Sequence, residues 1–370
     1  MEEYVYINGK KYRRGYTTGA CAAGAAKAGA AMLLTQTKVE YIDIDTPKGV
    51  RLKLKIDDVT LDQKYVKCAI QKDGGDDIDA THKAYIYATV KFNDNGEIKI
   101  LGGVGVGVVT KKGLGLEIGG PAINKTPREM ILKEVKEVLG VQGADVLIEV
   151  PEGEEIAKRT FNPRLGIIGG ISIIGTTGIV EPMSDEGWKK SLSLELEMKK
   201  QQGMSRVIFV SGNHGEKFAK EILGLDQGSI VRTSNFLGYM LEEAKRIGYK
   251  EILLIGHLGK YIKLAAGIFN THSHVADARS EILVANLALM GAPLTMLQEV
   301  SACVTTEEAM DIITHHCYEE VYTMIAKKCK KRTDMYLNVE DIRTEVIIFS
   351  LDGTLLGKSE KADELMEVFK

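Results

Sequence analysis

The sequence predicts two domains of different class: an α+β domain over residues 1–195 and an α/β domain with a mainly parallel sheet over residues 200–370. Three observations support this prediction. The chain of 370 residues is longer than one hydrophobic core usually fills. Its first half carries short strand-like runs around an Ala-rich segment, and its second half alternates strands with helices. A polar stretch that favours a helix, residues 184–203, separates the two halves.

Composition narrows the function classes. The 48 Lys and Arg residues nearly balance the 51 Asp and Glu residues, so no basic field indicates a nucleic-acid partner. The five cysteines form no CxxC pair, which is typical of reduced thiols in the cytoplasm. The N-terminus lacks the apolar segment of a signal peptide, and the longest uncharged stretch, residues 165–180, is shorter than the ~20 residues of a spanning helix. We therefore expect a cytoplasmic protein without membrane contact.

In the first domain, an Ala-rich segment at residues 17–36 predicts a helix that Thr17 or Thr18 caps. The alternating apolar and polar runs that follow predict strands separated by turns. A Gly-rich run, residues 102–122, comes next. The segment after it predicts a helix with Pro127 in its first turn and a glycine after its end.

In the second domain, three apolar strands each lead through a polar loop into a helix, which is the pattern of βαβ units on a parallel sheet. A long helix over residues 275–290 is stopped by Gly291 and Pro293. Another helix is expected over residues 306–331. An Asp-Gly dipeptide then marks the turn of a late strand pair.

The loops after the three strands, SGNHG, TSNFLG and GHLGK, are candidate ligand-binding loops. In open parallel sheets, ligands bind outside the carboxyl ends of the strands. Glycines allow close backbone approach to a ligand, and the polar side chains supply contacts. The fingerprint GxGxxG does not follow the first strand, which argues against an ordinary NAD site. The candidate contacts are Gly212, Asn213, Gly215, Ser234, Asn235, Gly256, His257 and Gly259.

The stretch NTHSHVADAR, residues 270–279, is the densest run of reactive side chains. We interpret it as a polar loop that enters a helix, where backbone N–H groups and Arg279 favour an anionic ligand. His272, His274 or Asp277 would then move a proton.

Two alternatives stay open for the same stretch. A metal site would need ligands beyond the two histidines, and the other histidines of the chain follow no known ligand spacing, so we expect no protein metal site. The second alternative is that Asn270, Thr271 and Ser273 only cap the helix, while Asp277 complements its dipole.

Two glycine-containing stretches of the first domain are further candidates. KDGGDDIDATH, residues 72–82, is either a solvated turn between strands or a set of carboxylates at a cleft. It lacks the later Glu of a calcium loop. The run at residues 102–122 would suit a phosphate, but it lacks the Gly-Lys-Ser/Thr ending of a P-loop.

Together these motifs resemble the CbiD family of cobalt-precorrin-5B C-1 methyltransferases, from the anaerobic route to cobalamin. They occur in the family order from about residue 13 to the late strands, and their joint specificity is high. Ile78 and Lys125 stand where the family usually has Pro, which are local changes in turns. The matching segments are RRGYTTGACAAGAAKA, KDGGDDIDATH, VGVGVVTKKGLGLEIGGPAINKTPREMI, AKRTFNPRLGIIGGISIIGTTGIVEPMS, SGNHG, TSNFLGYMLEEAKRIGYKEILLIGHLGK and KLAAGIFNTHSHVADARSEIL.

The resemblance implies methyl transfer from S-adenosylmethionine to C-1 of a cobalt-bound corrin precursor, which gives cobalt-precorrin-6A. Cobalt then arrives with the substrate. The family also implies an N-terminal domain related to the ribosomal-protein-S5-domain-like group, and a homo-oligomer is compatible with it. The alternatives are a small-molecule kinase of that fold and a non-catalytic corrinoid carrier.

The resemblance further implies roles for individual residues. The corrin substrate carries many carboxylates, which Arg, Lys and helix N-termini bind. A base is required if the ring sheds a proton, and His272 or His274 is the expected group, with Asp277 beside them. Residues expected to bind the corrin are Arg13, Arg14, Thr17, Thr18, Asp76, Asp77, Lys260 and Arg279, with Lys263 nearby. The methyl donor is expected at the three strand-end loops and at Asn270 and Thr271.

Overall fold

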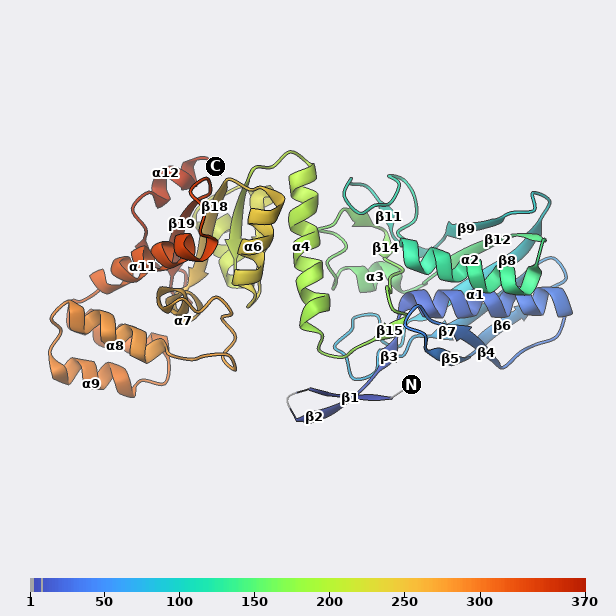
Figure 1. The fold of residues 1–370 in the computed structure, drawn as a ribbon, viewed down its shortest axis with the longest axis horizontal. Coiled ribbons are helices and arrows are strands. Elements are labelled where there is room, and N and C mark those ends of the chain that lie inside the picture. Colours follow the sequence, from blue (N-terminus) through green and yellow to red (C-terminus); the bar gives the residue numbers. More distant parts are fainter. Residues whose placement is uncertain (1–2, 8) are drawn as a thin grey trace. The chain divides into compact units, whose positions relative to one another are not determined.

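The computed structural model describes residues 3–7 and 9–370, which form two compact units, Met1–Asp185 and Glu186–Lys370 (Figure 1). Both units mix helices with strands. The helix α4 (Asp185–Gln201) lies at the start of the second unit, whereas the sequence placed the boundary near residues 195–200. The limits of independently folding domains stay a prediction.

The first unit is built on a five-stranded sheet with the strand order β6-β7-β8-β12-β9. Neighbouring strands are antiparallel, except that β12 and β9 are parallel. Helix α2 (Lys125–Leu139) packs against α1 (Thr18–Thr35), and Gly140 ends α2 as predicted. The strands of the sheet are β6 (Asp57–Leu61), β7 (Val66–Gln71), β8 (Tyr85–Asn93), β9 (Ile98–Gly102) and β12 (Gly143–Glu149).

Helix α1 is buried over most of its surface, because small side chains cover nearly all of its faces. It packs against β7, β8 and α2. A Cβ atom at Gly29 would lie 2.8 Å from Cγ2 of Val90, so the helix approaches the sheet more closely than a larger residue permits. Thr17 caps the helix as predicted, since its hydroxyl accepts the Ala20 N–H at 3.2 Å.

The Gly-rich run of the first unit serves backbone packing. Gly105 has a φ of +71°, and a Cβ atom there would lie 1.7 Å from the carbonyl oxygen of Val150. A Cβ atom at Gly170 would lie 2.2 Å from the Gly105 carbonyl oxygen. These glycines let short segments pack backbone against backbone, which explains the run without a phosphate. The short elements of this unit are β1 (Tyr4–Ile7), β2 (Lys10–Arg13), β3 (Gly15–Tyr16), β4 (Tyr41–Asp45), β5 (Arg51–Lys55), β10 (Gly105–Val106), β11 (Val108–Val109), α3 (Gly153–Ala157), β13 (Ile167–Ile168), β14 (Gly170–Ile171) and β15 (Ile179–Val180).

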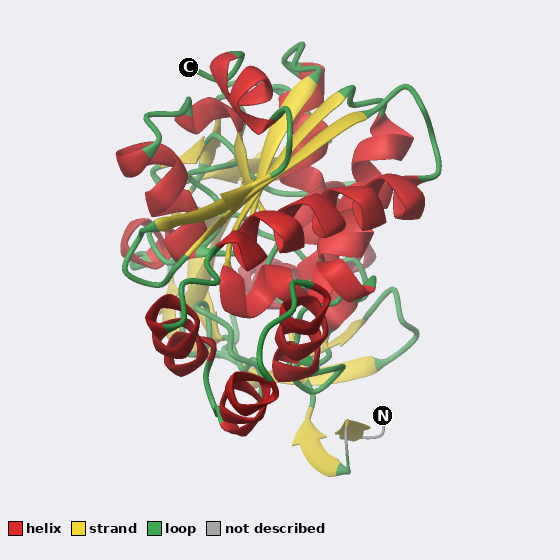
Figure 2. Ribbon diagram, turned by 90° about the vertical axis from the view of Figure 1, so that its left-hand side faces the viewer, coloured by secondary structure: helices red, strands yellow, loops and turns green. Residues whose placement is uncertain are grey.

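The second unit contains a five-stranded sheet with the order β17-β16-β18-β19-β20, and Figure 2 shows its strands with helices packed around them. The first four strands are parallel and β20 is antiparallel, so the predicted mainly parallel sheet is present. The chain passes from β16 to β17 on one side and then to β18 on the other, which makes a topological switch point beside β16. The strands are β16 (Arg206–Val210), β17 (Ile230–Arg232), β18 (Glu251–His257), β19 (Arg343–Phe349) and β20 (Leu355–Lys358).

Two predicted helices of the second unit are wrong in extent. The helix expected from residue 275 begins only at α8 (Arg279–Leu289), because Ala278 adopts a left-handed conformation with a φ of 50°. The helix expected over residues 306–331 is divided, because Cys317 has a φ of 61° and interrupts it. The remaining helices are α5 (Asn213–Lys217), α6 (Leu237–Ile247), α7 (Leu258–Tyr261), α9 (Leu294–Ala302), α10 (Thr306–His315), α11 (Glu320–Leu337), α12 (Ala362–Glu367), and the short η1 (Phe218–Ile222), η2 (Gln227–Ser229) and η3 (Ile262–Ala266).

Over residues 3–7 and 9–370, we find no helix with the length and apolar character needed to span a membrane.

Candidate functional site

The polar loops at the carboxyl ends of β17 and β18 meet at Asn235. Its side-chain oxygen accepts a hydrogen bond from Lys260 Nζ at 2.9 Å and one from the Thr271 hydroxyl at 3.4 Å. Its carbonyl oxygen accepts the Thr271 N–H at 3.0 Å. Asn235 therefore holds together two loops that the sequence predicts to bind ligand and the start of the NTHSHVADAR stretch. It does so through its side-chain amide and its backbone carbonyl.

Lys263 binds two backbone carbonyl groups of the NTHSHVADAR stretch. Its Nζ donates to the carbonyl oxygens of Thr271, at 3.2 Å, and Ala276, at 2.7 Å. The side chain is almost fully buried, and this burial lowers its pKa, with a further lowering by Arg279 and an opposing effect of Asp277. Burial, followed by the nearby charge of Lys263, likewise lowers the pKa of Lys260. The site therefore holds one buried and one half-buried lysine, whose hydrogen bonds go to neutral oxygens.

His257 ends β18 and carries a buried ring nitrogen without a partner. Among the residues that the structure describes, none forms a hydrogen bond with its Nδ1. A Cβ atom at Gly259 would lie 3.3 Å from this nitrogen and 3.1 Å from the hydroxyl oxygen of Thr306, so glycine keeps the space between them open. Burial, and then the charge of Lys260, lower the pKa of His257 to about 4. The imidazole is therefore neutral near pH 7, and its Nδ1 can accept a hydrogen bond.

The first strand-end loop approaches His257 as well. A Cβ atom at Gly215 would lie 3.3 Å from the carbonyl oxygen of Ile255 in β18, so this glycine packs α5 against the neighbouring strand. His214 on this loop makes a small electrostatic contribution to the lowered pKa of His257. Gly212 and Asn213 lie at the start of α5, where Gly212 has an extended backbone.

The two histidines of NTHSHVADAR are exposed and order their own loop. The Asn270 side chain accepts the His272 N–H at 3.1 Å, and His272 Nδ1 accepts the His274 N–H at 3.1 Å. Their rings stack with centroids 5.1 Å apart. The capping alternative is wrong, because Ala278 is the N-cap of α8 and no side chain caps that helix. Within the described residues, no group of three or more His, Cys, Asp or Glu side chains is placed to hold a metal ion.

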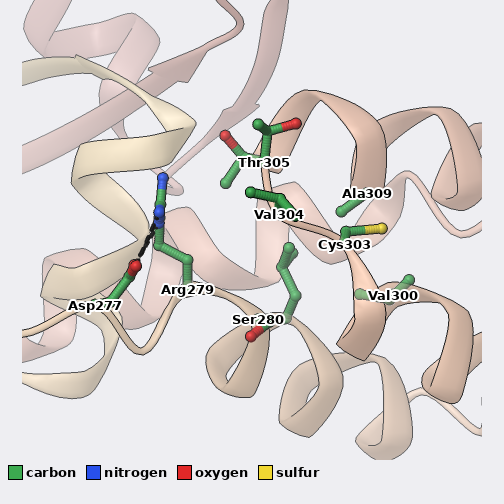
Figure 3. A pocket seen from close by; sticks show the side chains of 10 residues that line it. Asp277, Arg279, Ser280, Val300, Cys303, Val304, Thr305 and Ala309 are labelled. Atoms are coloured by element: carbon green, nitrogen blue, oxygen red, sulfur yellow. Dashed lines mark hydrogen bonds and ion pairs between the residues drawn. The ribbon is translucent and has the colours of Figure 1, made fainter.

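Asp277 and Arg279 form a two-point ion pair at the mouth of a small cavity (Figure 3). One of the two hydrogen bonds, from Arg279 Nη2 to Asp277 Oδ2, measures 2.9 Å. The hydrogen bond from Arg279 is the main reason why the pKa of Asp277 lies below its usual value. Asp277 is thus a weak base while the pair is intact, and its assignment as a proton acceptor stays a prediction.

The cavity behind this pair lies between α8, α9 and α10 and measures about 70 Å³. Leu283, Val300 and Ala309 form an apolar part of its lining, and Thr306 contributes a polar group. Sequence reasoning missed Thr306 and the cavity. The segment TTEE predicts a capped helix start, and Thr305 does cap α10 by accepting the Glu308 N–H at 3.1 Å. Nothing in that motif indicates that the helix start lies near His257.

The residues of the first unit predicted to bind the corrin make contacts within that unit. The Arg13 guanidinium binds both oxygens of Asp73, at 2.6 and 2.7 Å, and the Arg13 N–H donates to Asp76 at 2.6 Å. Asp77 accepts the Met183 N–H at 2.9 Å. The acidic turn is therefore neither a purely solvated turn nor an open set of carboxylates.

The start of α1 is covered in the same way. The Thr18 hydroxyl exchanges hydrogen bonds with the backbone of Ile174, at 2.9 and 3.1 Å, and the Gly19 N–H donates to the Ile174 carbonyl. Arg14 lies 3.6 Å from the carboxylate of Glu181. These contacts give Thr17, Thr18 and the two arginines structural roles, and their assignment to substrate binding stays a prediction.

Comparison with known proteins identifies the family. The family model of CbiD matches residues 5–182, and that of the CbiD C-terminal domain matches residues 270–360. The cobalt-precorrin-5B C(1)-methyltransferase of Clostridioides difficile (strain 630) is 55% identical, with 100% of both chains covered.

This chain belongs to the CbiD family.

Further CbiD relatives agree. The cobalt-precorrin-5B C(1)-methyltransferase of Photorhabdus laumondii is 52% identical over 99% of this chain and 98% of the relative, and that of Listeria monocytogenes serovar 1/2a is 50% identical over 100% of both. A crystal structure of a cobalamin biosynthesis protein (cbiD) from Archaeoglobus fulgidus is 26% identical, with a TM-score of 0.39, over 75% of this chain and 88% of that one. The C-terminal CbiD match begins at Asn270, the first residue of NTHSHVADAR, and includes α8, α9 and α10.

Proposed function

We propose that this chain transfers a methyl group from S-adenosylmethionine to C-1 of cobalt-precorrin-5B and gives cobalt-precorrin-6A in anaerobic cobalamin biosynthesis. One observation carries the proposal: curated relatives of that name are 50–55% identical over the full length of the chain. Cobalt belongs to the substrate. We further propose a cytoplasmic location, which the five free cysteines support.

The strand-end site of the second unit suits this reaction chemically. In the transfer, the bond from sulfur to methyl breaks while the bond from methyl to the ring carbon forms, and the sulfur keeps the electron pair. No protein nucleophile is needed, so the protein contributes mainly by holding donor and acceptor in line. Lys260, Lys263 and Arg279 supply positive charge for carboxylates of the ligands.

A proton acceptor is required if the ring loses a proton after methylation. His272, His274 and Asp277 are the candidates from the sequence. The structure adds His257 as a neutral hydrogen-bond acceptor in the same site, because its buried Nδ1 has no partner among the described residues, although a pKa of about 4 makes it a weak base. We place the donor at the strand-end loops and at Asn270 and Thr271, which Asn235 links.

For the first unit we propose a relation to the ribosomal-protein-S5-domain-like group, which the packing of α1 and α2 beside a five-stranded sheet supports. We also propose that its polar cluster around Arg13, Thr18 and Asp76 contributes contacts to the corrin carboxylates. Such binding requires that some of the internal hydrogen bonds give way to the substrate. Homo-oligomerisation is part of the same proposal.

The test is an anaerobic assay with purified protein, S-adenosylmethionine and cobalt-precorrin-5B, read by mass spectrometry. We expect a mass gain of one methyl group together with S-adenosylhomocysteine. Corrinoid binding without either product would overturn the proposal and favour a carrier. Phosphate release from ATP would favour a kinase, although the glycines on which that alternative depends serve backbone packing.

A pair of variants tests the proposed site. Asp277→Ala and Arg279→Ala are expected to lower the rate at least about tenfold, since hydrogen bonds to charged groups contribute about 1.5–3 kcal/mol. Arg246→Ala is the matched control, because Arg246 pairs with Glu243 on the exposed surface of α6. Full activity in both site variants would show that residues 270–279 lie outside the site.

A further inference from the structure

The cavity between α8, α9 and α10 is lined by the charged pair Asp277–Arg279 together with a mixture of polar and apolar side chains. Asp277 and Arg279 meet at the mouth, as the dashed lines in Figure 3 show, while Leu283 and Val300 line the interior. Its lining also includes Thr306, which would lie 3.1 Å from a Cβ atom at Gly259. Thr306 therefore lines the cavity and also lies near Gly259 of the strand-end loop that contains His257.

The size of the cavity limits what it can hold. A cavity needs about 10–15 Å³ to hold one water-sized group, so this cavity of about 70 Å³ holds roughly five to seven heavy atoms. Adenine and a corrin ring are far larger. An amino-acid head group, consisting of the nitrogen, the α-carbon and the three carboxylate atoms, fits with room for the start of its side chain.

The charges at the mouth favour a ligand that carries both signs. A side-arm carboxylate of the corrin would gain Arg279 but would meet the ionised carboxylate of Asp277, whose pKa is lowered. A zwitterion can replace each partner of the existing Asp277–Arg279 pair, because its carboxylate binds the guanidinium and its ammonium group binds the aspartate. The apolar lining next to the pair suits the methylene groups of the same ligand.

We propose that this cavity receives the α-amino-acid end of S-adenosylmethionine, with its carboxylate on Arg279 and its ammonium group on Asp277. The inference rests on the proposed function, since it assumes S-adenosylmethionine as donor. The nucleoside end of the donor then extends past Thr306 toward the strand-end loop that contains His257 and Gly259.

The test compares two nucleosides by isothermal titration calorimetry on the full chain. S-adenosylhomocysteine carries the amino-acid end, and 5′-methylthioadenosine lacks it. Arg279→Gln and Asp277→Asn are each expected to weaken S-adenosylhomocysteine about tenfold to hundredfold, as for a lost hydrogen bond between charged groups. Both variants should bind 5′-methylthioadenosine within about twofold of the unmodified protein. Arg246→Gln is the control and should change neither affinity, and thermal melting of each variant confirms that it is folded.

Each of the other possible results contradicts a different part of the proposal. Unchanged affinity for S-adenosylhomocysteine in both variants, or equal weakening of both nucleosides, overturns the amino-acid subsite. Weaker binding in Arg279→Gln with tighter binding in Asp277→Asn overturns the zwitterion and assigns the cavity to a carboxylate alone, such as a corrin side arm. If the unmodified protein binds neither nucleoside, the donor assignment of the proposed function fails and the subsite fails with it.

Discussion

Two polar clusters of this molecule are both candidate sites in the sequence, and they differ in whether their cations pair with carboxylates. In the acidic turn of the first unit, buried Lys72 pairs with Asp79, and Arg13 pairs with both oxygens of Asp73. In the strand-end cluster of the second unit, Lys260 and Lys263 donate only to amide and carbonyl oxygens. The first cluster is internally neutralised, whereas the two lysines of the second form no hydrogen bond to a carboxylate of the described residues.

The difference teaches how to separate a structural charge cluster from a ligand site. Burial raises the pKa of Asp79, but the charge of Lys72 and hydrogen bonds from Lys72 and Thr81 outweigh it, so the pKa lies below its usual value. The charges of Arg13 and Lys72 thus stabilise Asp73 and Asp79 in their ionised forms. In the second cluster, burial lowers the pKa values of Lys260 and His257, and the opposing charge of Glu307 only partly offsets the effect at His257. An anionic ligand would supply the missing compensation.

The largest effect on stability is expected when one ion pair of the neutralised cluster is removed. Asp79→Ala leaves Lys72 buried without its partner and should lower the free energy of unfolding by about 3–5 kcal/mol in urea titrations of the full chain. Asp94→Ala, in an exposed turn of the same unit, is the control and should have little effect. Asp277→Asn should cost less than about 1 kcal/mol, because the Asp277 side chain is exposed and its ion pair with Arg279 is screened by water. A loss in Asp79→Ala as small as that in Asp277→Asn would remove the distinction between the clusters.

The next test concerns the neutral histidine of the second cluster. The pKa of His257 lies at about 4 in the folded chain, below the ordinary value of 6.5, so stability is full above pH 6.5 and declines as the pH falls toward 4. The variant His257→Phe lacks this titrating group, so the melting temperature of the variant should fall less steeply between pH 6.5 and 4 than that of the unmodified chain. His315→Phe, at an exposed histidine, should keep the original slope. Parallel profiles for the unmodified chain and His257→Phe would contradict a buried neutral ring.

A smaller effect separates the strand-end site from other unpartnered atoms. The hydroxyl of Tyr322 is buried and forms no hydrogen bond with the described residues, and the charges that act on it are those of Glu319 and Asp311. Tyr322→Phe should therefore raise the free energy of unfolding by about 1 kcal/mol, since it removes an unsatisfied polar group, and should leave methyl transfer unchanged. A fall in activity with intact folding would mean that this hydroxyl also serves a ligand.

The smallest effect tests a local change in the first unit. Lys125 is the first residue of α2, and Asn124 before it is extended with a ψ of 164°, which is compatible with a following Pro. Lys125→Pro should raise the free energy of unfolding by about 0.4–1 kcal/mol by restricting the unfolded chain. Lys133→Pro, inside the same helix, should instead cost about 3 kcal/mol or more. Destabilisation by both would show that the start of α2 is not relaxed.

Much of the secondary structure follows from local sequence. The cap at Thr17, the start of α2 near Pro127, and the parallel strands of the second unit were all predicted, because caps, proline geometry and apolar periodicity act over a few residues. The errors are local conflicts that periodicity does not reveal. Left-handed Ala278 delays α8, and left-handed Cys317 divides a helix that its pattern predicts to be continuous.

The sequence by itself determined the fold class, the family and the loops in which the candidate residues lie. Only the tertiary structure decided which charges meet. Arg13 forms an ion pair with Asp73, which lies 60 positions away in the chain, and Lys260 donates a hydrogen bond to Asn235, 25 positions away. The cavity behind Arg279 exists because three helices pack around it. Backbone propensities act over a few residues, whereas charge compensation and cavity shape depend on side chains that chain folding alone brings together.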